Sequence, residues 1–552
     1  MAPRISSFCC RLSPALIALL CLASPRVEGG TSPLPLHTSG NALYDNAGKP
    51  VVLKGLNICS LEWTNGGDHL MASVRKAIDI WHATLIRLPI AQDRWEGRMP
   101  DDKSGPNLSD GGAAYRKLVD GVIAAASASG VYVLVDLHWS DMGAWGSNLG
   151  QHKMPDDNSA LAWRDIAARY AGNPGVLFDL YNEPHDVSWQ VWRNGGNVVE
   201  DSAAYHSPGM QGLADAVRST GANNVIAVGG LAYAFDLSGI AKGNAISGPN
   251  IIYSCHIYPA QPSDWDASVG AVGAMAPVLI GEFGSDSTSD YARFIPRMIR
   301  WVNEHHYSAA AWCMHTEATP CLIASWNYDP TFWEGTYVYS WLNGGPAAPV
   351  QLQADGGAGR ISLSWAAVPG ANGYRVYRSA KPGHEAYGAP LASNTAGTAF
   401  VDASLADRAT YYYRVAAVGA ACDSGLSNEM GATAGMAGGF EAPQPAFTFT
   451  ATAVPPKTPP NRPVAITATA TDVGKAGGTG VMIVVAVHDA NDKDLYQHEF
   501  PHQSIDPGQT LRFSLSWTPP AAGSYHVSVG AFADGWSPKY GWDENAAAFV
   551  VP

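Results

Sequence analysis

The chain has 552 residues, more than one hydrophobic core usually organises, so we expect about two to four domains. Its formal net charge is −14, which disfavours nucleic acid and other polyanionic partners and is more compatible with a neutral ligand. The sequence contains neither a phosphate-cradling glycine loop nor a clear set of metal ligands, so we expect no metal and no organic cofactor.

The N-terminus has the features of a secretion signal. Arg4 and Arg11 precede the apolar run ALIALLCLA, which is too short to span a bilayer. We therefore expect residues 1–23 to be a cleaved signal peptide. The mature chain should be secreted, either extracellular or periplasmic, with no membrane attachment, and should act as a monomer.

Five cysteines remain after this leader: Cys59, Cys255, Cys313, Cys321 and Cys422. In an oxidising compartment, Cys313 and Cys321 could close a small disulfide loop. The sequence alone leaves the pairing open.

Residues 41–342 alternate apolar, β-branched runs with helix-like stretches, a pattern typical of repeated βα units around a parallel sheet. Eight such runs occur: VVLKGLN, ATLIRLPI, YVLVDLHW, VLFDLYNEP, NVIAVGG, NIIYSCHIY, VLIGEFG and AAAWCMH. Eight βα units in about 300 residues predict a closed (β/α)₈ TIM barrel.

After NGGPAAP the helical periodicity stops, and short alternating strands separated by Gly, Pro and Asp begin. This change predicts an all-β sandwich over residues 347–434. The segment resembles a fibronectin type III module, because Trp365 stands on an early strand, YRVYR follows, and Leu405 precedes Tyr411 as in that family's tyrosine corner.

Residues 440–552 follow the small-residue stretch GATAGMAGG and contain five further strand-like runs, which predict a second, immunoglobulin-like sandwich. Trp536, Tyr540 and Trp542 stand close together in this segment. They could form a sugar-stacking platform, or they could simply pack a sheet edge.

Two acidic residues end strands of the predicted barrel. In VLFDLYNE, strict alternation puts Phe178 on the outer face and Asp179, Tyr181 and Glu183 on the inner face. In VLIGEFG, the same alternation places Val278, Ile280 and Glu282 on one face of the strand. Both acids therefore lie at the C-terminal end of the barrel, where barrel enzymes build their active sites.

Polar or aromatic groups end four further strands: Arg87, which shares a face with Leu85; His138; His256 with Tyr258; and Trp312. Any one of them alone is more often structural than functional. A purely structural role for all would require six strands to end by chance with such groups facing one pocket. The sequence therefore predicts an active site there.

The motifs IRLP, DLH, VLFDLYNEP, HIY, GEFG and AAWCM occur in this order over residues 41–342, which resemble a family 5 glycoside hydrolase of the kind that includes secreted endoglucanases. The resemblance implies that Glu183 is the general acid/base and Glu282 the nucleophile. It also implies roles in substrate binding, or in steadying Glu282, for Arg87, His138, Asn182, His256, Tyr258 and Trp312.

The implied chemistry needs two carboxyl groups roughly 5 Å apart, one to attack the anomeric carbon and one to protonate the leaving oxygen. Arg87 is expected to keep Glu282 ionised, whereas Glu183 should hold its proton longer. The sequence thus predicts an endo-acting retaining β-glycosidase that hydrolyses β-1,4-glucan. Two alternatives stay open: an endo-β-1,4-mannanase, or a non-catalytic carbohydrate-binding or adhesion protein on a degenerate barrel.

Overall fold

The structure is a computed structural model, and it describes residues 32–99, 105, 109–286, 291–383, 385, 389–436, 439–441, 446–457, 459–474, 478–490, 494–533 and 539–552. The expected leader and Trp536 lie outside these residues. Within the described ranges, no helix is both long enough and apolar enough to cross a membrane.

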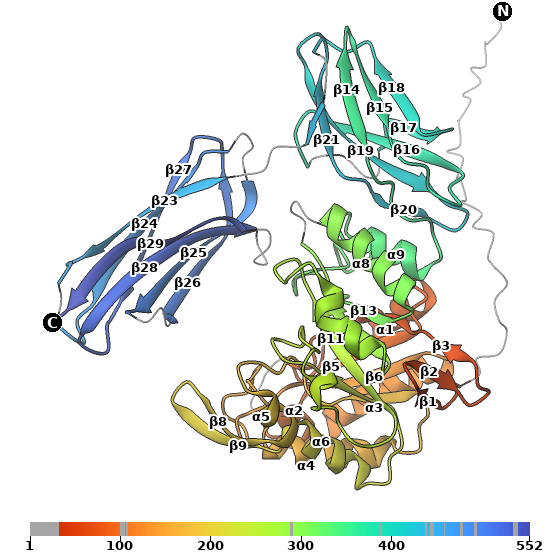
Figure 1. The fold of residues 1–552 in the computed structure, drawn as a ribbon, viewed down its shortest axis with the longest axis vertical. Coiled ribbons are helices and arrows are strands. Elements are labelled where there is room, and N and C mark those ends of the chain that lie inside the picture. The colour runs from red at the N-terminus through yellow and green to blue at the C-terminus, as the bar shows by residue number, and fades with distance from the viewer. Residues whose placement is uncertain are drawn as a thin grey trace, which may run out of the picture. The chain divides into compact units, whose positions relative to one another are not determined.

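A closed barrel of eight parallel strands forms the first part of the chain, as predicted (Figure 1). The barrel strands are β4 (Lys54–Asn57), β5 (Leu85–Ala91), β6 (Tyr132–Trp139), β7 (Val176–Asp179), β10 (Ile226–Gly229), β11 (Ile251–Ile257), β12 (Val278–Phe283) and β13 (Ser308–Ala311). They follow one another around the barrel in chain order, and β13 closes it by pairing with β4.

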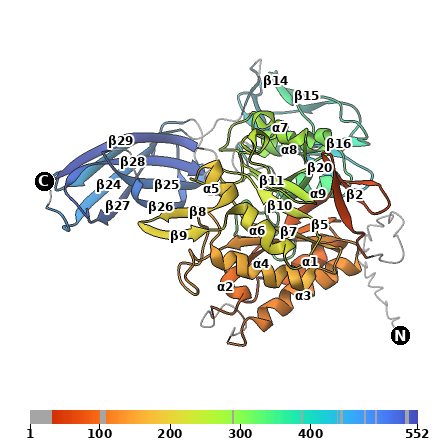
Figure 2. The same cartoon turned by 60° about the horizontal axis from the view of Figure 1, so that its bottom comes forward.

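Helices cover the outside of the strands (Figure 2). They are α1 (Leu70–Asp79), α2 (Gln92–Trp95), α3 (Ala113–Ala128), α4 (Asp157–Tyr170), α5 (Trp189–Asn194), α6 (Gly209–Arg218), α7 (Ala271–Gly273), α8 (Tyr291–His305) and α9 (Gly335–Leu342). Trp163 of α4 packs edge-on against Phe178 of β7, with ring centroids 5.4 Å apart. A separate cluster that includes Leu85, Leu134 and Leu177 fills the barrel interior. Strand residues thus alternate between these two apolar layers.

Two small β elements were not predicted. A three-stranded sheet precedes the barrel, made of β1 (Leu36–Ser39), β2 (Ala42–Asp45) and β3 (Pro50–Val51). A hairpin of β8 (Gly196–Glu200) and β9 (Ala203–Ser207) lies between α5 and α6. The positive φ of Asp201 and Ser202 at its tip allows the tight reversal.

The predicted strands after residue 347 form two sheets. One contains β14 (Gln353–Gly357), β15 (Arg360–Ser364) and β18 (Ala399–Ala403); the other contains β16 (Gly373–Ser379), β17 (Ala392–Thr395), β19 (Thr410–Val418), β20 (Asp423–Leu426), β21 (Met430–Thr433) and β22 (Gly439–Glu441). Trp365 is buried in the core that these strands share. The second sheet continues past the predicted end at residue 434, because β22 pairs with β21.

The last part of the chain is also all β. Its sheets are β23 (Phe447–Val454), β24 (Val464–Asp472) and β27 (Thr510–Trp517), and β25 (Gly478–Asp489), β26 (Asp494–Ile505), β28 (Gly523–Ala533) and β29 (Lys539–Val551). Ile466 of β24 and Ile483 of β25 lie in one core between the two sheets. The five predicted strands are present, whereas β26 and β29 were missed.

The strict alternation predicted for the fourth barrel strand is wrong beyond Asp179, because β7 ends there. Tyr181 turns outward into the layer between strands and helices, where its hydroxyl contacts Ser140. Glu183 has a φ of 49° and so lies in the left-handed region. This conformation is uncommon for a residue with a Cβ and often marks a functional site.

The prediction that Val278 and Ile280 share a face with Glu282 is also wrong, because both side chains pack outward against the helices. Cys255 of β11 pairs with Ile280, but the next pair is His256 with Glu282, so Gly281 is an extra residue. Such a β-bulge re-aims the side chain that follows it. Glu282 faces the barrel interior because of this bulge.

The structure gives all five described cysteines of the predicted mature chain as thiols, including Cys313 and Cys321, whose pairing the sequence left open. The sulfur of Cys313 instead lies 3.0 Å from that of Cys59.

We expect Gly281→Ala to abolish most of the activity of the barrel. An added Cβ would lie 2.4 Å from Ser254 Oγ and 2.9 Å from His256 Nε2, so His256 or the bulge must shift. A misplacement of about 1 Å in an active site can cost about a hundredfold in rate. Measurement of kcat/KM on the β-1,4-glucan expected from the sequence would reveal this loss.

Gly121→Ala in α3 is the matched control, because the nearest atom to its added Cβ is Met71 Sδ at 3.8 Å. This variant should keep its activity and gain up to about 1 kcal/mol in free energy of unfolding. Full activity of Gly281→Ala would contradict the role of the bulge.

Candidate active site

A single buried guanidinium organises the C-terminal mouth of the barrel. Arg87 of β5 is fully buried. Its recorded partners are Asp179 Oδ2 (2.9 Å, from Nε), Asn57 Oδ1 (3.0 Å) and Glu282 Oε1 (2.6 Å) from one terminal nitrogen, and Asn182 Oδ1 (2.9 Å) and Asp136 Oδ1 (3.0 Å) from the other. Five barrel strands therefore contribute to one polar network.

Three carboxyl groups share this one cation, and burial raises the pKa of two of them, Asp136 and Asp179. Burial raises the pKa of Asp136 to about 7, although Arg87 opposes the shift. Burial likewise raises the pKa of Asp179 to about 6. For Arg87 burial lowers the pKa, but the neighbouring carboxylates outweigh it and the net shift is upward. The guanidinium thus stays charged at the centre of the network.

Glu282 is held at both oxygens. One oxygen accepts the hydrogen bond from Arg87, and the other accepts a hydrogen bond of 2.7 Å from the hydroxyl of Tyr258. The side chain is only 5% exposed. These two donors, one charged and one neutral, fix the position of both carboxylate oxygens.

Glu183 has fewer partners and greater exposure. Its Oε1 lies 3.0 Å from Nδ1 of His256, and its side chain is 21% exposed. Burial raises the pKa of Glu183 to about 6, and His138 and Arg87 partly offset this shift. The group is therefore suited to carry a proton in mildly acidic solution.

The two acids meet across the mouth of the barrel. One ligand atom each of Glu183, His256 and Glu282 lies within 4.8 Å of the others. Oxygens this close match the roughly 5–5.5 Å between the carboxyl groups of retaining glycosidases, and not the roughly 6.5–9.5 Å of inverting ones. The same three groups are close enough to hold a metal ion.

Both histidines of the site are neutral at neutral pH, since burial lowers the pKa of His138 and of His256 to about 4. Nδ1 of His138 lies 2.6 Å from Asp136 Oδ2, so this nitrogen carries the proton. Its Nε2 is then free to accept from the side-chain amide of Asn182 at 3.3 Å. This pairing fixes the orientation of Asn182.

Trp312 forms an aromatic wall beside these polar groups. Its ring stacks with that of His138, with centroids 5.5 Å apart and planes 19° apart. It packs in a small cluster with Cys59 and Cys313, against which Trp63 and Tyr258 also lie. Trp139 is 6.5 Å from Trp63. Flat rings around a polar centre suit the two kinds of surface on a sugar.

An exposed tyrosine lies next to Glu183. Tyr233 is 47% exposed and stacks on His185, with ring centroids 4.1 Å apart. Its backbone N–H donates to the carbonyl of Pro184. Ala232, Tyr233 and Ala234 have φ values of 54°, 59° and 59°, a run of three left-handed residues. Strain of this kind persists at functional sites.

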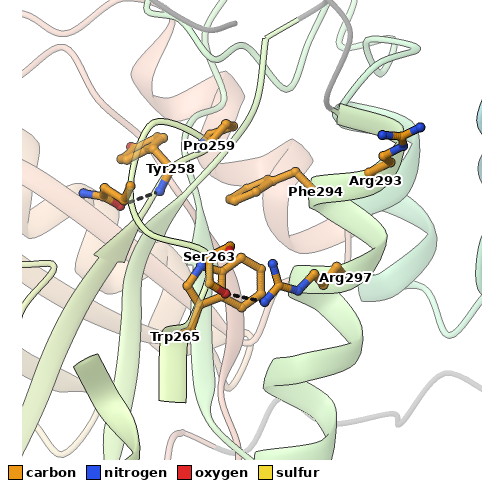
Figure 3. Close-up of a pocket in the computed structure, with 8 residues that line it drawn as sticks. Tyr258, Pro259, Ser263, Trp265, Arg293, Phe294 and Arg297 are labelled. Carbon is orange, nitrogen blue, oxygen red and sulfur yellow. Dashed lines mark hydrogen bonds between the residues drawn. The ribbon is translucent and has the colours of Figure 1, made fainter. Parts of the chain in front are cut away.

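A cavity of about 190 Å³ lies between the loop after β11 and α8, and Tyr258 is one of the residues that line it (Figure 3). Arg297 crosses it, packs 4.0 Å over the ring of Trp265 and donates to the carbonyl of Ser263. The side chain of Gln261 accepts a hydrogen bond from the N–H of Tyr258. These two hydrogen bonds hold the loop that carries Tyr258 in place.

All eight predicted site residues gather at this mouth. Sequence reasoning did not assign Asn57, Asp136, Asp179, Gln151 and Tyr233 to the site. The signal for Asp136 and Asp179 was available, because an acid on the inner face of a barrel strand must find a cation. Asn57 and Gln151 carried no comparable signal.

The aromatic group predicted in the last part of the chain has a structural explanation in part. Trp542 pairs across strands with Gly530, and an added Cβ at Gly530 would lie 2.2 Å from the indole ring. An aromatic ring that covers a cross-strand glycine stabilises a sheet. Tyr540 packs near Phe447 at 6.0 Å between centroids.

Residues 44–318 match the family described as Cellulase (glycosyl hydrolase family 5). An endoglucanase of Paenibacillus polymyxa is 26% identical over 325 residues, which cover 50% of this chain and 79% of that protein. Endoglucanase E-5 of Thermobifida fusca is 25% identical, with 58% of this chain and 62% of that protein covered. Endoglucanase MaCel5A of a Microbulbifer strain is 28% identical, and the alignment covers 46% of this chain and 45% of that protein.

Among solved structures, the chain is similar to β-glucanase SdGluc5_26A of Saccharophagus degradans in complex with cellotetraose. The TM-score is 0.45 at 20% identity, with 56% of this chain and 94% of that chain covered. The catalytic domain of Thermobifida fusca endoglucanase Cel5A gives a TM-score of 0.43 at 22% identity, with 56% and 96% covered.

The barrel with its converging acids and the family match together define a glycoside hydrolase of the endoglucanase-like type. Residues 44–318 of its barrel match the model of glycosyl hydrolase family 5, the family that the sequence motifs predicted.

We expect Arg87→Ala to lower the free energy of unfolding by about 3–5 kcal/mol, because it leaves three buried carboxyl groups without their cation. A carboxyl group whose pKa is raised on folding binds more protons in the folded chain, so stability falls as pH rises. The deficit should therefore be larger at pH 8 than at pH 5, as measured by urea unfolding.

Arg169→Ala is the control, because the Arg169–Asp120 pair is 40% and 37% exposed. It should cost about 0–1 kcal/mol at either pH. An equally small loss for Arg87→Ala would show that the network does not depend on this guanidinium.

Proposed function

We propose that the chain is an endo-acting retaining β-glycosidase that hydrolyses β-1,4-glucan by two displacements. The approach of Glu183 and Glu282 to within 4.8 Å carries this proposal. A non-catalytic barrel would have no need to hold a buried acid and a partly exposed acid at the spacing that double displacement requires. The endoglucanases among the relatives support glucan as the polymer.

In the first step, Glu282 attacks the anomeric carbon while Glu183 gives its proton to the departing glycosidic oxygen. Glu282 is ready for attack because Arg87 and Tyr258 orient both of its oxygens. The pKa of Glu183, raised by burial to about 6, lets it hold the proton until the bond breaks.

In the second step, Glu183, now ionised, takes a proton from water, and this water releases the sugar from Glu282. As the attacking carboxylate, Glu282 is negative before its bond to the sugar forms, and this charge raises the proton affinity of Glu183. When Glu282 is bonded to the sugar, that charge is gone, so Glu183 becomes a weaker base that releases its proton more easily. Glu183 therefore changes from general acid to general base without the help of a further group.

The residues around the two acids distinguish the two sides of the bond that is cleaved. Trp312 and His138 lie next to the polar centre, and we assign them the sugar whose bond is cleaved. Asn182, held by His138 and by Gln151 at 2.8 Å, faces the sugar 2-hydroxyl. Tyr233 lies beside Glu183, the proton donor, so we assign it the leaving-group side of the chain.

The remaining assignments rest on the sequence. We infer secretion, outside the cell or into the periplasm, from the leader in residues 1–23. We keep a fibronectin type III-like module for residues 347–434, and a further module that could bind carbohydrate for residues 440–552. The mechanism itself uses only residues of the barrel and needs no cofactor.

We expect the purified protein to release reducing ends from carboxymethyl cellulose and mixed-linkage β-glucan, with much weaker action on xylan and galactomannan. Glu282→Gln should lose at least about a thousandfold in kcat, because the amide cannot form the glycosyl–enzyme bond. A reducing-end assay over these polymers, with both proteins side by side, measures this. The first product should keep the anomeric configuration.

Cleavage of galactomannan alone would keep the mechanism and change the polymer to mannan. Inactivity of the parent protein on every polymer would refute the proposed enzymatic activity. The hypothesis of a non-catalytic carbohydrate-binding or adhesion protein would then remain. Inversion at the anomeric carbon would refute the two-step mechanism.

The alkaline limb of kcat/KM should lie near pH 6 with natural glucan. Glu183 must be protonated in the free enzyme, and its pKa of about 6 means that the proton is present below this pH and lost above it. In Glu183→Gln, assayed with a dinitrophenyl cellobioside whose leaving group needs no acid, this limb should disappear. The same limb in the variant would assign it to another group.

A further inference from the structure

Three buried cysteines surround the place where the barrel closes. Cys59 follows β4, and Cys313 follows β13, the two strands that pair to complete the barrel. Their sulfurs are 3.0 Å apart, although 254 residues separate them in the chain. Cys321 is buried in a segment whose backbone pairs with that of Cys313, through Leu322 N–H to Cys313 O at 2.9 Å.

We propose that Cys59 and Cys313 are an oxidative modification site and form a disulfide across this closing seam, with Cys321 left as a thiol. This inference goes beyond the proposed function and does not depend on it. It also replaces the Cys313–Cys321 pairing that the sequence suggested.

The backbone around both cysteines is already fixed. Met314 N–H donates to Asn57 O at 2.9 Å, so the segment after β13 is tied to the end of β4. Cys313 N–H donates to Pro320 O at the same distance. A disulfide bond is about 2.05 Å long, so the two sulfurs need to approach by only about 1 Å. Small side-chain rotations suffice, without movement of the strands.

The oxidation is balanced by a small-molecule disulfide such as oxidised glutathione. The thiolate of one cysteine attacks the small disulfide, and one small thiol leaves. The second cysteine then attacks the mixed disulfide, the Cys59–Cys313 bond forms and a second small thiol leaves. Two cysteine thiols lose two protons and two electrons, and one small disulfide gains them.

Burial controls when this reaction can occur. Cys59 is 2% exposed and Cys313 is fully buried. Burial also raises the pKa of both thiols, so little reactive thiolate exists in the folded barrel. The bond should therefore form while the barrel is closing, and a reductant should reach it only when the barrel opens.

The bond would lie directly behind the sugar-binding wall. Trp312 precedes Cys313 in the chain and packs with both cysteines, and Trp63 and Tyr258 contact the same cluster. Closing a loop of this length also restricts the unfolded chain strongly. The cross-link would hold the first and last barrel strands together at the end where substrate binds.

The test uses the full chain, unfolded in denaturant with a reductant and then refolded with oxidised glutathione. Free thiols are then alkylated in denaturant, and the protein is digested without reduction for peptide mass spectrometry. We expect a peptide pair linked through Cys59 and Cys313, with Cys321 alkylated. In a parallel melt, reduction in denaturant followed by refolding with reductant should lower the melting temperature by about 5 °C.

Cys59→Ser and Cys321→Ser are the matched pair of variants. Cys59→Ser should melt at the temperature of the reduced parent and gain nothing from oxidised glutathione. Cys321→Ser should keep both the linked peptides and the response to reductant. If Cys59→Ser fails to fold, the peptide map of the parent protein still shows whether Cys59 and Cys313 are linked.

Three results would overturn the proposal. They are a Cys313–Cys321 or Cys59–Cys321 link, complete alkylation of Cys59 and Cys313 after oxidative refolding, and a response to reductant that persists in Cys59→Ser.

Discussion

One buried guanidinium sets the conditions for everything else at the mouth of this barrel. Arg87 faces Asp136, Asp179 and Glu282, and none of these acids is more than 5% exposed. Buried charges are costly, so each must keep its partner and its geometry. The network therefore positions Glu282 and, through Asn182, the start of the segment that carries Glu183. The geometry of the proposed catalytic acids therefore depends on the hydrogen bonds that satisfy this one cation.

The two acids that we propose as catalytic differ because the barrel surrounds them differently. Glu282 is enclosed, accepts from Arg87 and Tyr258, and has its direction set by the bulge at Gly281. Glu183 is more open and has a left-handed backbone conformation, and among the described residues the hydrogen-bond partner of its carboxylate is a neutral imidazole. Such a pair of environments separates proton donor from nucleophile without a difference in residue type. Tyr233 adds a stacking surface on the donor's side.

Much of this arrangement could be predicted from the sequence, and the rest depends on local geometry. Eight β-branched runs predicted the barrel. Polar or aromatic groups at the strand ends predicted seven of the eight site residues that gather at its mouth, and the family resemblance added Asn182. Period-two alternation could not foresee the extra residue at Gly281 or the end of β7 at Asp179. The strands β26 and β29 were missed because Pro, His and charged residues interrupt their apolar pattern. Contacts between distant segments, such as Cys59 with Cys313, leave no local pattern.

The most direct test of the account is to trap the intermediate with 2-deoxy-2-fluoro-cellobiosyl fluoride, which slows the second displacement more than the first. The account predicts one covalent sugar per chain, found by peptide mass spectrometry on Glu282, with turnover restored as the label is released. A label on Glu183, or inactivation without any covalent sugar while the parent still cleaves glucan, would contradict it.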